Sequence, residues 1–424
     1  MNEVKLGDVA DVRISGVDKK TLPNEIPVRL CNYTDVYYNW TIRTENRQKF
    51  MLASAKEDEI SKFRLHAGQV ALTKDSETKF DIGHSTFISE DFDDVILGYH
   101  CALISPHPGM LDGQYLNAMF RTRHISDYLA RNAGGSGQRY YLSEAAIKSI
   151  PLKLPPITTQ LRIAAILGSI DEKIELNRKK IAELEALTKT IYDYWFVQFD
   201  FPDKNGKPYK SSGGKMVWNE QLKREIPEGW GVGTVGELGE IVAGGTPSTD
   251  NPSYWSQDGI AWITPKDLSL TNNKYIRHGE HDISEKGLCN SSAQLMPRRS
   301  VLLSTRAPIG YIAVADCDIC TNQGFKSIVP NGNYGSEFIY YSLSALIPYI
   351  KTLGVGSTFA EVSKSALSVV QLAFPRKEIV MQFENVASQI GNNRRICELA
   401  IEKLIRLRDT LLPLLMNGQV KVKE

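Results

Sequence analysis

The sequence predicts an α+β fold in which two similar globular domains are separated by two long helices. Three observations support this prediction. The chain has 424 residues, which exceeds the size at which one hydrophobic core keeps growing. Its second half repeats its first half, and each repeat ends in a long stretch with helical periodicity. We expect the two helices to pack as an antiparallel coiled coil with pseudo-twofold symmetry.

The composition is that of a globular protein, with 42% hydrophobic and 23% charged residues. No apolar run approaches the roughly 18 residues of a membrane-spanning helix, and the start "MNEVKLGDVADV" is no secretion signal. Six cysteines in so long a chain do not form a disulfide framework, which favours a reducing compartment. We therefore expect a cytoplasmic protein with no membrane partner. Because the net charge is only +1, any DNA-binding face must be local or completed by partners.

The repeat is clearest around the helices. Setting Ser143 against Ser363, an offset of 363 − 143 = 220 residues, aligns "SEAAIKSIPLKLP" with "SKSALSVVQLAFP" without a gap. The same register then holds for some fifty residues through both helical stretches. Fainter echoes precede them: "KLGDVADV" (5–12) with "TVGELGEI" (234–241), "NYTDV" (32–36) with "TPKDL" (264–268), and "GQVALT" (68–73) with "RSVLLS" (299–304).

The repeat divides the chain into five parts. They are a first globular domain (1–142), a central helical spacer (143–199), a linker (200–228), a second globular domain (229–362) and a C-terminal helical spacer (363–424). The linker stretch "DFPDKNGKPYKSSGGKMVW" (200–218) has the Pro, Gly, Ser and Lys content of exposed irregular chain. Short Val- and Ile-rich runs in both globular domains predict small twisted sheets with a few helices.

Both helical stretches carry a coiled-coil seam. Positions 163, 167, 170, 174, 177, 181, 184, 188, 191 and 195 follow the 4-3 spacing, and nearly all are apolar. The matching positions of the second copy are also largely apolar. Asn177 in the first seam and Arg394 in the second are polar interruptions that fix register. Helices that only pack one domain would explain the pattern too, but the duplication of the whole unit favours a scaffold. A helix of about 40 residues rises roughly 60 Å, a spacer of nucleic-acid dimensions.

Two short motifs approach catalytic or metal sites without completing them. "DNPSY" (250–254) resembles the Asn-Pro-Pro-Tyr motif of adenine methyltransferases, but Ser253 replaces the second proline and no cofactor loop follows a strand. We expect Asn251 and Pro252 to form a turn. "CDIC" (317–320) has metal-knuckle spacing but no second pair of ligands, so strand packing is favoured. The sequence predicts no catalytic residue, no metal site and no cofactor.

Nearly the whole chain resembles the DNA-specificity (S) subunit of type I restriction-modification systems. The resemblance lies in the order of the parts and in the phrases "LPPITTQLRIAAILGSIDEKI", "WFVQFDFP", "NGKPYKSSGGKMVWNEQLKREIPEGW", "AGGTPSTDNPSYW", "WITPKDL" and "TNQGFKSI". It implies a subunit that is not catalytic alone, with two target recognition domains that each read half of a split double-stranded DNA site. It also implies that the long helices dock two methyltransferase (M) subunits and, through them, restriction (R) subunits. The first domain departs from the pattern, with "LCNYTDV" in place of "WITPKDL", as expected if the domains read different sequences.

Candidate DNA contacts follow from residue type. Glycines in "AGGTPST" (243–249) let backbone approach closely, and its hydroxyls can donate to phosphate oxygens, although a plain tight turn is nearly as compatible. Arginine and lysine supply phosphate or guanine contacts. The candidates are Thr246, Ser248, Thr249, Lys266, Arg298, Arg299, Arg306 and Lys326 in the second domain, and Arg43, Arg47, Lys49, Lys74 and Lys79 in the first. Leu176 and Ile396 lie off the seam and are the candidate contacts with M subunits.

One alternative function remains open from the residues: a non-catalytic coiled-coil scaffold that holds proteins and does not contact DNA directly. The near-neutral charge of the chain favours this alternative. The paired but divergent domains, with their Gly, Thr and Ser turns and clustered arginines and lysines, favour recognition of DNA.

Overall fold

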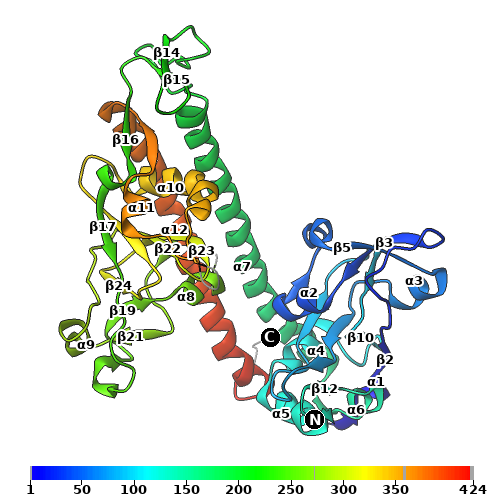
Figure 1. Cartoon of the computed structure of the whole chain (residues 1–424). Helices are drawn as coiled ribbons and strands as arrows, with labels where there is room; N and C mark the ends of the chain where they lie inside the picture. The colour runs from blue at the N-terminus through cyan, green and yellow to red at the C-terminus, as the bar shows by residue number, and fades with distance from the viewer. Residues whose placement is uncertain (1, 272, 357–359, 421–424) are drawn as a thin grey trace. The chain divides into compact units, whose positions relative to one another are not determined.

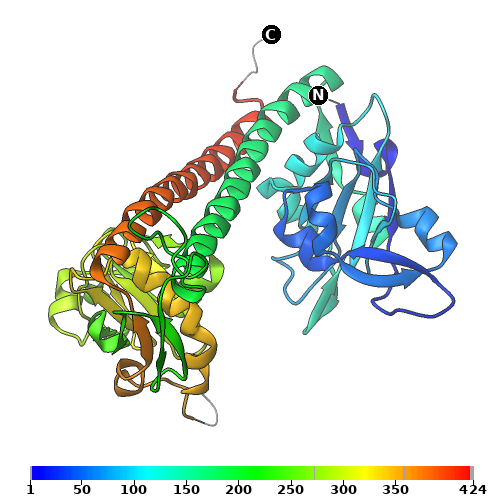
Figure 2. The same cartoon turned by 90° about the horizontal axis from the view of Figure 1, so that it is seen from above.

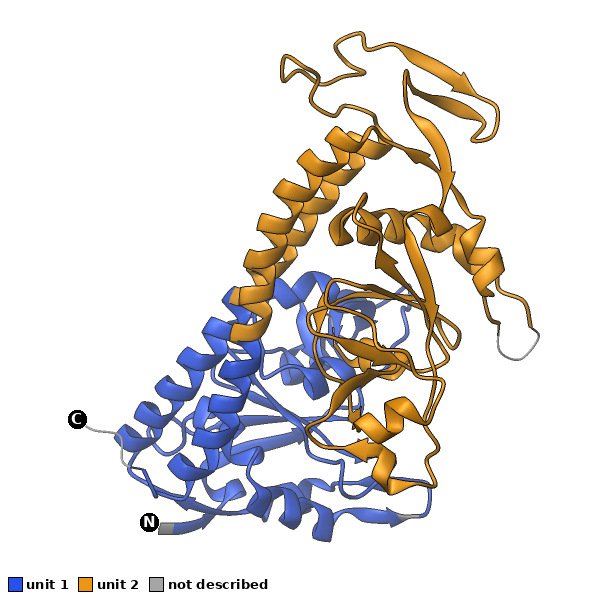
Figure 3. Ribbon diagram, turned by 90° about the vertical axis from the view of Figure 1, so that its left-hand side faces the viewer, with its two compact units in different colours: residues 1–176, 401–424 blue, residues 177–400 orange. Residues whose placement is uncertain are grey.

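The computed structural model describes residues 2–271, 273–356 and 360–420. The chain forms two compact units: unit 1 comprises Met1–Leu176 and Ile401–Glu424, and unit 2 comprises Asn177–Ala400 (Figure 3). Two long helices, α7 (Ile157–Tyr192) and α12 (Lys377–Met416), each begin in one unit and end in the other (Figure 1). No helix in the described part of the chain combines the length and apolarity needed to cross a membrane.

Unit 1 is built on a five-stranded sheet of order β2-β10-β6-β8-β4, in which only the β4–β8 pair is parallel. These strands are β2 (Ala10–Ile14), β10 (Cys101–Pro106), β6 (Val70–Thr73), β8 (Ser85–Ile88) and β4 (Thr41–Ile42). The smaller sheets are β5-β3-β9 (Met51–Ala55, Ile26–Cys31, Val95–Leu97), β11-β12-β7 (Gly134–Ser136, Arg139–Tyr141, Asp75–Ser76) and β1-β13 (Asn2–Lys5, Pro151–Leu154). The short helices are α1 (Leu6–Val9), α2 (Tyr33–Tyr38), α3 (Glu57–Phe63), α4 (Gly113–Phe120), α5 (Arg123–Asn132) and α6 (Glu144–Lys148).

Unit 2 has the same sheet order, β17-β25-β22-β23-β20, again with only the last pair parallel. These strands are β17 (Gly239–Ala243), β25 (Lys326–Pro330), β22 (Val301–Thr305), β23 (Ile309–Ala315) and β20 (Tyr275–Ile276). The smaller sheets are β18-β21-β19-β24 (Trp255–Ser256, His281–Ile283, Ile260–Ile263, Ile319–Thr321), β16-β26 (Gly231–Thr234, Gln371–Phe374) and β14-β15 (Met216–Asn219, Arg224–Pro227). The short helices are α8 (Pro265–Leu270), α9 (Glu285–Cys289), α10 (Ser336–Thr352) and α11 (Lys364–Ser368).

The sequence echoes fall on equivalent elements of the two units. "NYTDV" and "TPKDL" each begin a short helix in which the carboxylate at the third helical position accepts from the backbone N–H of the N-cap residue, at 2.8 Å for Asn32 and 2.7 Å for Thr264. "GQVALT" and "RSVLLS" supply the central strands β6 and β22. Ser143 and Ser363 both cap the helix that follows them. The predicted duplication of a mixed α/β domain is confirmed.

In each unit the start of one long helix packs with the end of the other. The unit 1 core contains Ile163 and Leu167 of α7 together with Leu412 and Leu415 of α12. The unit 2 core contains Phe383 and Ala387 of α12 together with Tyr192 of α7 and the adjoining Phe196. The helices therefore run antiparallel within each unit (Figure 2). Both apolar seams are buried or half-buried along their length, as predicted. The pseudo-twofold relation between the units stays a prediction.

An acidic side chain of a long helix anchors the edge of each five-stranded sheet. In unit 1, Asp171 of α7 accepts from Thr41 Oγ1 at 2.9 Å and from Arg43 Nη2 at 2.6 Å. In unit 2, Glu398 of α12 accepts from the backbone N–H groups of Lys274 and Tyr275 at 2.9 and 3.3 Å. The strands involved, β4 and β20, occupy the same place in their sheets. Each five-stranded sheet is thus fixed to its helix by a buried carboxylate.

The predicted linker is only partly irregular. Turns and bends occupy most of 203–215, but Met216–Asn219 pairs with Arg224–Pro227 as a β-hairpin. Phe201, expected on exposed chain, is 5% exposed and stacks on Trp230 and Tyr209 with ring centroids 5.3 and 4.7 Å apart. Packing of these three aromatic rings outweighs the flexibility that the Gly and Ser content favours, so the expectation of exposed chain was wrong at Phe201.

Candidate nucleic-acid interface

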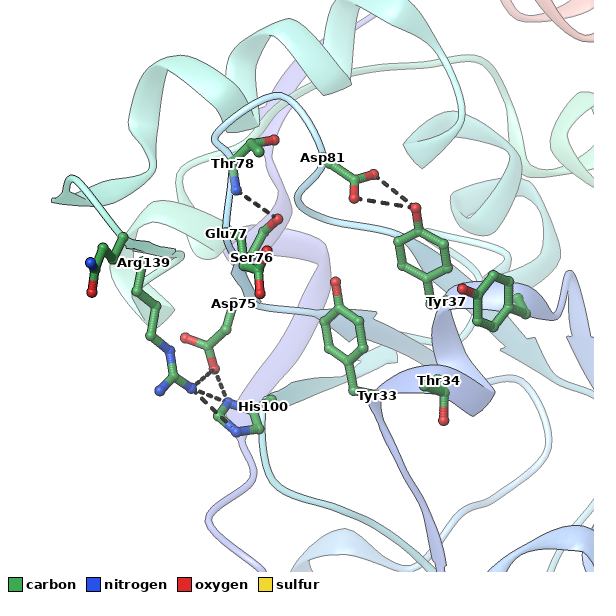
Figure 4. A pocket seen from close by; sticks show the side chains of 12 residues that line it. Tyr33, Thr34, Tyr37, Asp75, Ser76, Glu77, Thr78, Asp81, His100 and Arg139 are labelled. Atoms are coloured by element: carbon green, nitrogen blue, oxygen red, sulfur yellow. Dashed lines mark hydrogen bonds and ion pairs between the residues drawn. The ribbon is translucent and has the colours of Figure 1, made fainter. Parts of the chain in front are cut away.

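Unit 1 carries an open cavity of about 580 Å³ at one end of its main sheet. Helix α2 forms one wall with the rings of Tyr33 and Tyr37, and the β7 strand and the β11–β12 hairpin form the other (Figure 4). The lining residues are Tyr33, Thr34, Tyr37, Tyr38, Asp75, Ser76, Glu77, Thr78, Asp81, His100, Gln138 and Arg139. Aromatic faces and hydrogen-bonding groups therefore meet in one exposed hollow.

The acidic groups of this cavity are held by specific donors. Asp75 Oδ2 lies 2.9 Å from Lys74 Nζ and 2.5 Å from His100 Nδ1, and Arg139 Nη2 is 3.7 Å away. Burial alone would raise the pKa of Asp75, but the hydrogen bonds from Lys74 and His100 outweigh it and hold that pKa below its ordinary value. His100 has a φ of 72°, which is uncommon outside glycine. This backbone conformation is strained, and it places the imidazole beside Asp75.

Tyr33 and Tyr37 of α2 remain protonated at neutral pH. Burial raises the pKa of Tyr33 to about 12. The pKa of Tyr37 is raised by burial and by the hydrogen bond that its hydroxyl donates to Asp81 at 3.0 Å. Tyr38 is 75% exposed beside them. Exposed aromatic rings with a polar end are suited to contacts with bases and sugars.

Unit 2 presents a different surface at the equivalent place. Arg306 follows the central strand β22, as Asp75 follows β6, and Arg306 bridges to Glu361 as Asp75 pairs with Tyr141. Glu361 lies 3.8 Å from Arg306 Nη1 and 3.3 Å from Lys326 Nζ. The two units therefore offer divergent chemistry on one scaffold, mainly aromatic and acidic in unit 1 and more basic in unit 2.

Four of the sequence-predicted residues of unit 2 gather around this place. Thr246 Oγ1 donates to the side chain of Gln323, which precedes β25. Lys266 lies on α8, whose Pro265 approaches Gly324, and pairs with Glu280 at 2.7 Å. Arg306 and Lys326 share Glu361, as described above. Ser248 and Thr249 are exposed nearby in sequence, with the Ser248 carbonyl accepting from Trp255 Nε1 at 3.2 Å.

Arg298 and Arg299 face the long helix α12. Arg298 Nη2 lies 3.1 Å from Asp316, whose other carboxylate oxygen accepts from Arg395 Nε of α12 at 2.6 Å. Arg299 Nη2 donates to Asn392 Oδ1 of α12 at 3.3 Å. These contacts bind the sheet to the helix, which accounts for both arginines without a DNA contact.

The basic residues predicted in unit 1 do not form one patch. Lys74 borders the cavity through Asp75, and Lys79 is exposed with its Nζ 5.0 Å from the ring centre of Phe80. Arg43 is engaged by Asp171, and Arg47 makes two hydrogen bonds to Asp94, at 2.8 and 2.7 Å. Lys49 is exposed at the end of the same short helical turn.

The glycine loop of unit 2 is explained by packing. A Cβ atom on Gly244 would lie 1.9 Å from the Asn322 carbonyl oxygen, and one on Gly245 would lie 2.3 Å from the Ser292 backbone. Both glycines are thus required by contacts inside the protein. The tight-turn interpretation accounts for them, while Thr246, Ser248 and Thr249 remain candidate phosphate contacts.

The two incomplete motifs take structural roles. Asn251 caps a single 3-10 turn (Pro252–Tyr254) and accepts from the Ser253 N–H at 3.1 Å, as expected of a turn. Cys320 is buried in β24, and Cys317 Sγ donates to the Arg277 carbonyl at 3.3 Å. The preference for strand packing over a metal knuckle is consistent with these contacts.

Sequence reasoning missed the hairpin that borders the unit 1 cavity. The run "GGSGQRYY" (134–141) forms β11 and β12, with φ of 103° at Gly135 and 78° at Gly137. These positions require glycine and place Gln138 and Arg139 near the turn. The alternation of glycines with polar residues before two tyrosines was the signal that could have identified it.

Exposed apolar side chains mark the outward faces of the long helices. Leu176 on α7 is 53% exposed and Ile396 on α12 is 62% exposed. Both residues lie off the buried seam, where the sequence placed them.

Comparison with known proteins gives consistent matches. The chain matches the family model described as the type I restriction modification DNA specificity domain over residues 1–186 and 227–396. It is 38% identical over 180 residues to the type I restriction enzyme MjaIX specificity subunit of Methanocaldococcus jannaschii, a match that spans 41% of each chain. It is 24% identical over 397 residues to the HindI specificity subunit of Haemophilus influenzae, spanning 81% of this chain and 85% of that one. The crystal structure of a type I restriction-modification S subunit from M. genitalium shares the fold, with a TM-score of 0.54 at 14% identity over 98% of this chain and 95% of that chain.

Proposed function

Because this chain belongs to the type I restriction-modification DNA specificity family, we propose that it reads a bipartite double-stranded DNA target and directs methyltransferase (M) and restriction (R) subunits to it. The proposal rests on the repeated domain. The two units share the strand order of their five-stranded sheets, but the surfaces that follow β6 and β22 carry different side chains. A scaffold that only held proteins would have no need of this divergence. Such a subunit acts where the cell keeps its DNA, which in this proposal is the cytoplasm.

The two surfaces suit different parts of DNA recognition. In unit 2, Lys266, Arg306 and Lys326 supply positive charge for phosphate oxygens or guanine edges. In unit 1, the tyrosine-lined cavity supplies aromatic faces and few free cations. Local faces of this kind reconcile DNA binding with a net charge of only +1.

The test of this proposal is sequence selection from random DNA duplexes by the chain co-expressed with an M subunit, repeated across a salt series. We expect enrichment of two short half-sites separated by a fixed gap of unselected bases. Affinity should fall steeply with salt because phosphate contacts release counterions. A complex that assembles with M and shows no sequence preference would instead support the protein-scaffold alternative.

We propose that the chain has no catalytic activity of its own and depends on M and R for chemistry. The rigorously purified chain should transfer no labelled methyl group to duplex DNA and should not cleave it. Addition of M subunit and methyl donor to the same preparation should restore methyl transfer. Methyl transfer by the isolated chain would contradict this assignment.

The outward faces of α7 and α12 are the proposed docking surface for two M subunits. Changing Leu176 and Ile396 to Asp should reduce co-purification with M at least tenfold, because a carboxylate cannot be buried against an apolar partner without cost. Both side chains are exposed, so the isolated chain should keep its thermal stability. Arg123 lies on α5 and its side chain is 94% exposed. Arg123→Ala is therefore a control that should leave assembly unchanged. Undiminished co-purification of the double variant would show that M docks elsewhere.

A further inference from the structure

The β7–β12 strand pair at the rim of the unit 1 cavity sets a donor beside an acceptor. Tyr141 lies opposite Asp75 and Tyr140 opposite Ser76. Arg139 precedes this pair on β12, and Glu77 follows it immediately after β7. Both side chains line the cavity (Figure 4).

Arg139 is held at one end and open at the other. Its Nη2 lies 3.7 Å from Asp75 Oδ2, with which it forms an ion pair, while the side chain is 57% exposed. Its Nε and Nη1 make no hydrogen bond with any residue that the structure describes. A guanidinium fixed on one side keeps its remaining N–H groups in a defined direction.

Glu77 is the available carboxylate of the cavity. Asp75 is occupied by Lys74 and His100, and Asp81 accepts from Tyr37 and His84. Glu77 is exposed, and within the described ranges of the chain it has no hydrogen bond or ion pair. Among the described residues, neither Glu77 nor Asp81 has a lysine or arginine partner. These two carboxylates repel phosphate oxygens, so the surface favours base edges over the DNA backbone.

We propose that the Arg139–Glu77 pair reads a G·C base pair in the half-site of unit 1. In the major groove guanine offers two acceptors, O6 and N7, that match an arginine fork, and its paired cytosine offers an N4 amino donor that matches a carboxylate. A donor and an acceptor side by side therefore complement this base pair, and the reversed or A·T pair leaves at least one group unsatisfied. The inference rests on the proposed function, since it assigns a base to the site.

The experiment is sequence selection and methylation mapping with the complex of the chain and M, comparing wild type with Arg139→Ala, Arg139→Lys and Glu77→Gln. We expect Arg139→Ala to reduce discrimination at one base-pair position of one half-site about tenfold or more. Arg139→Lys should relax the same position, because lysine keeps the charge without the fork. Glu77→Gln should relax it less, and the other half-site should be unchanged in all three.

The controls separate this inference from the proposed function. Arg123→Ala removes an equal charge from the same unit and should leave the target unchanged. An unaltered target in Arg139→Ala and Arg139→Lys, or an equal loss of affinity for every sequence, would overturn the inference while leaving DNA recognition intact. A wild-type complex that selects no sequence would overturn the proposed function itself. Co-purification with M and an unchanged melting temperature establish that each variant is folded.

Discussion

Adding seven residues to each long helix should widen the gap between the two half-sites and leave the recognised bases unchanged. The insertions belong between Ile174 and Ile181 of α7 and between Arg394 and Ile401 of α12, which preserves the apolar seam. Each of these two intervals contains the boundary at which its helix passes from one unit to the other. Placed at that boundary, after Leu176 and after Ala400, the insertions leave each unit with its own core, its five-stranded sheet and the carboxylate that anchors the sheet.

The expected size of the change follows from helix geometry. A heptad lengthens a helix by roughly 10 Å at 1.5 Å per residue, and duplex DNA rises about 3.4 Å per base pair. The gap should grow by up to about 3 base pairs, less whatever the DNA absorbs by bending. Methylation mapping of the reconstituted complex measures both the bases and the gap.

A matched insertion separates helix length from disturbance of the seam. Five residues at the same two points add similar length but rotate the following seam away from its partner. That variant should lose stability and assembly with M. Altered bases with an unchanged gap in the heptad variant would mean that the helices act on recognition and do not set the spacing.

The duplication and the seam were predictable because they are periodic. The alternation of buried positions along α7 and α12 is a local property of the sequence, and the helix caps at Asn32 and Thr264 depend on residues three positions apart. The two five-stranded sheets have the same strand order, so the weakly similar sequence segments lie on equivalent strands. The mixed α/β class therefore followed from pattern alone.

The site residues were less predictable because their partners are distant in sequence. Charge type marked Arg43 as a DNA contact, but its partner Asp171 lies 128 residues away on a helix. Arg139 of β12 and His100, in the turn before β10, meet across 39 residues. A single sequence shows which residues can bind an anion. Only the fold shows which of them are already paired with a carboxylate of the protein, as Arg43 is.

A buried ion pair of unit 2 should dominate the stability of that unit. Lys274 and Glu337 are 1% and 0% exposed, with Nζ 2.5 Å from the carboxylate, which also accepts from the Tyr275 hydroxyl at 2.7 Å. Glu337→Gln removes the carboxylate that is hydrogen-bonded to this ammonium. Breaking a buried pair from one side costs about 3–5 kcal/mol, so we expect a loss of that order in the free energy of unfolding, measured with denaturant.

Two controls test the cause of that loss. Glu280→Gln removes the carboxylate of the exposed Lys266–Glu280 pair, and it should change stability little because solvent screens such pairs. Replacing Lys274 by Met and Glu337 by Leu together removes both charges and should recover much of the stability lost in Glu337→Gln. Since β20 and Glu398 meet beside this pair, the single variant should also weaken reading of the second half-site.

The deficit of Glu337→Gln should shrink as pH rises from 7 toward 10. Burial is the largest influence on Lys274 and lowers its pKa below the ordinary 10.5, while Glu337 opposes that shift. Without the carboxylate the folded-state pKa falls further, whereas the unfolded chain keeps the ordinary value. Between these two pKa values the unfolded chain binds more protons, so stability is lost as pH falls through the folded-state pKa and is regained as pH rises toward 10.5. A difference between variant and wild type that stayed constant over this range would show that the loss comes from the hydrogen bonds of Glu337 and not from an unpaired cation.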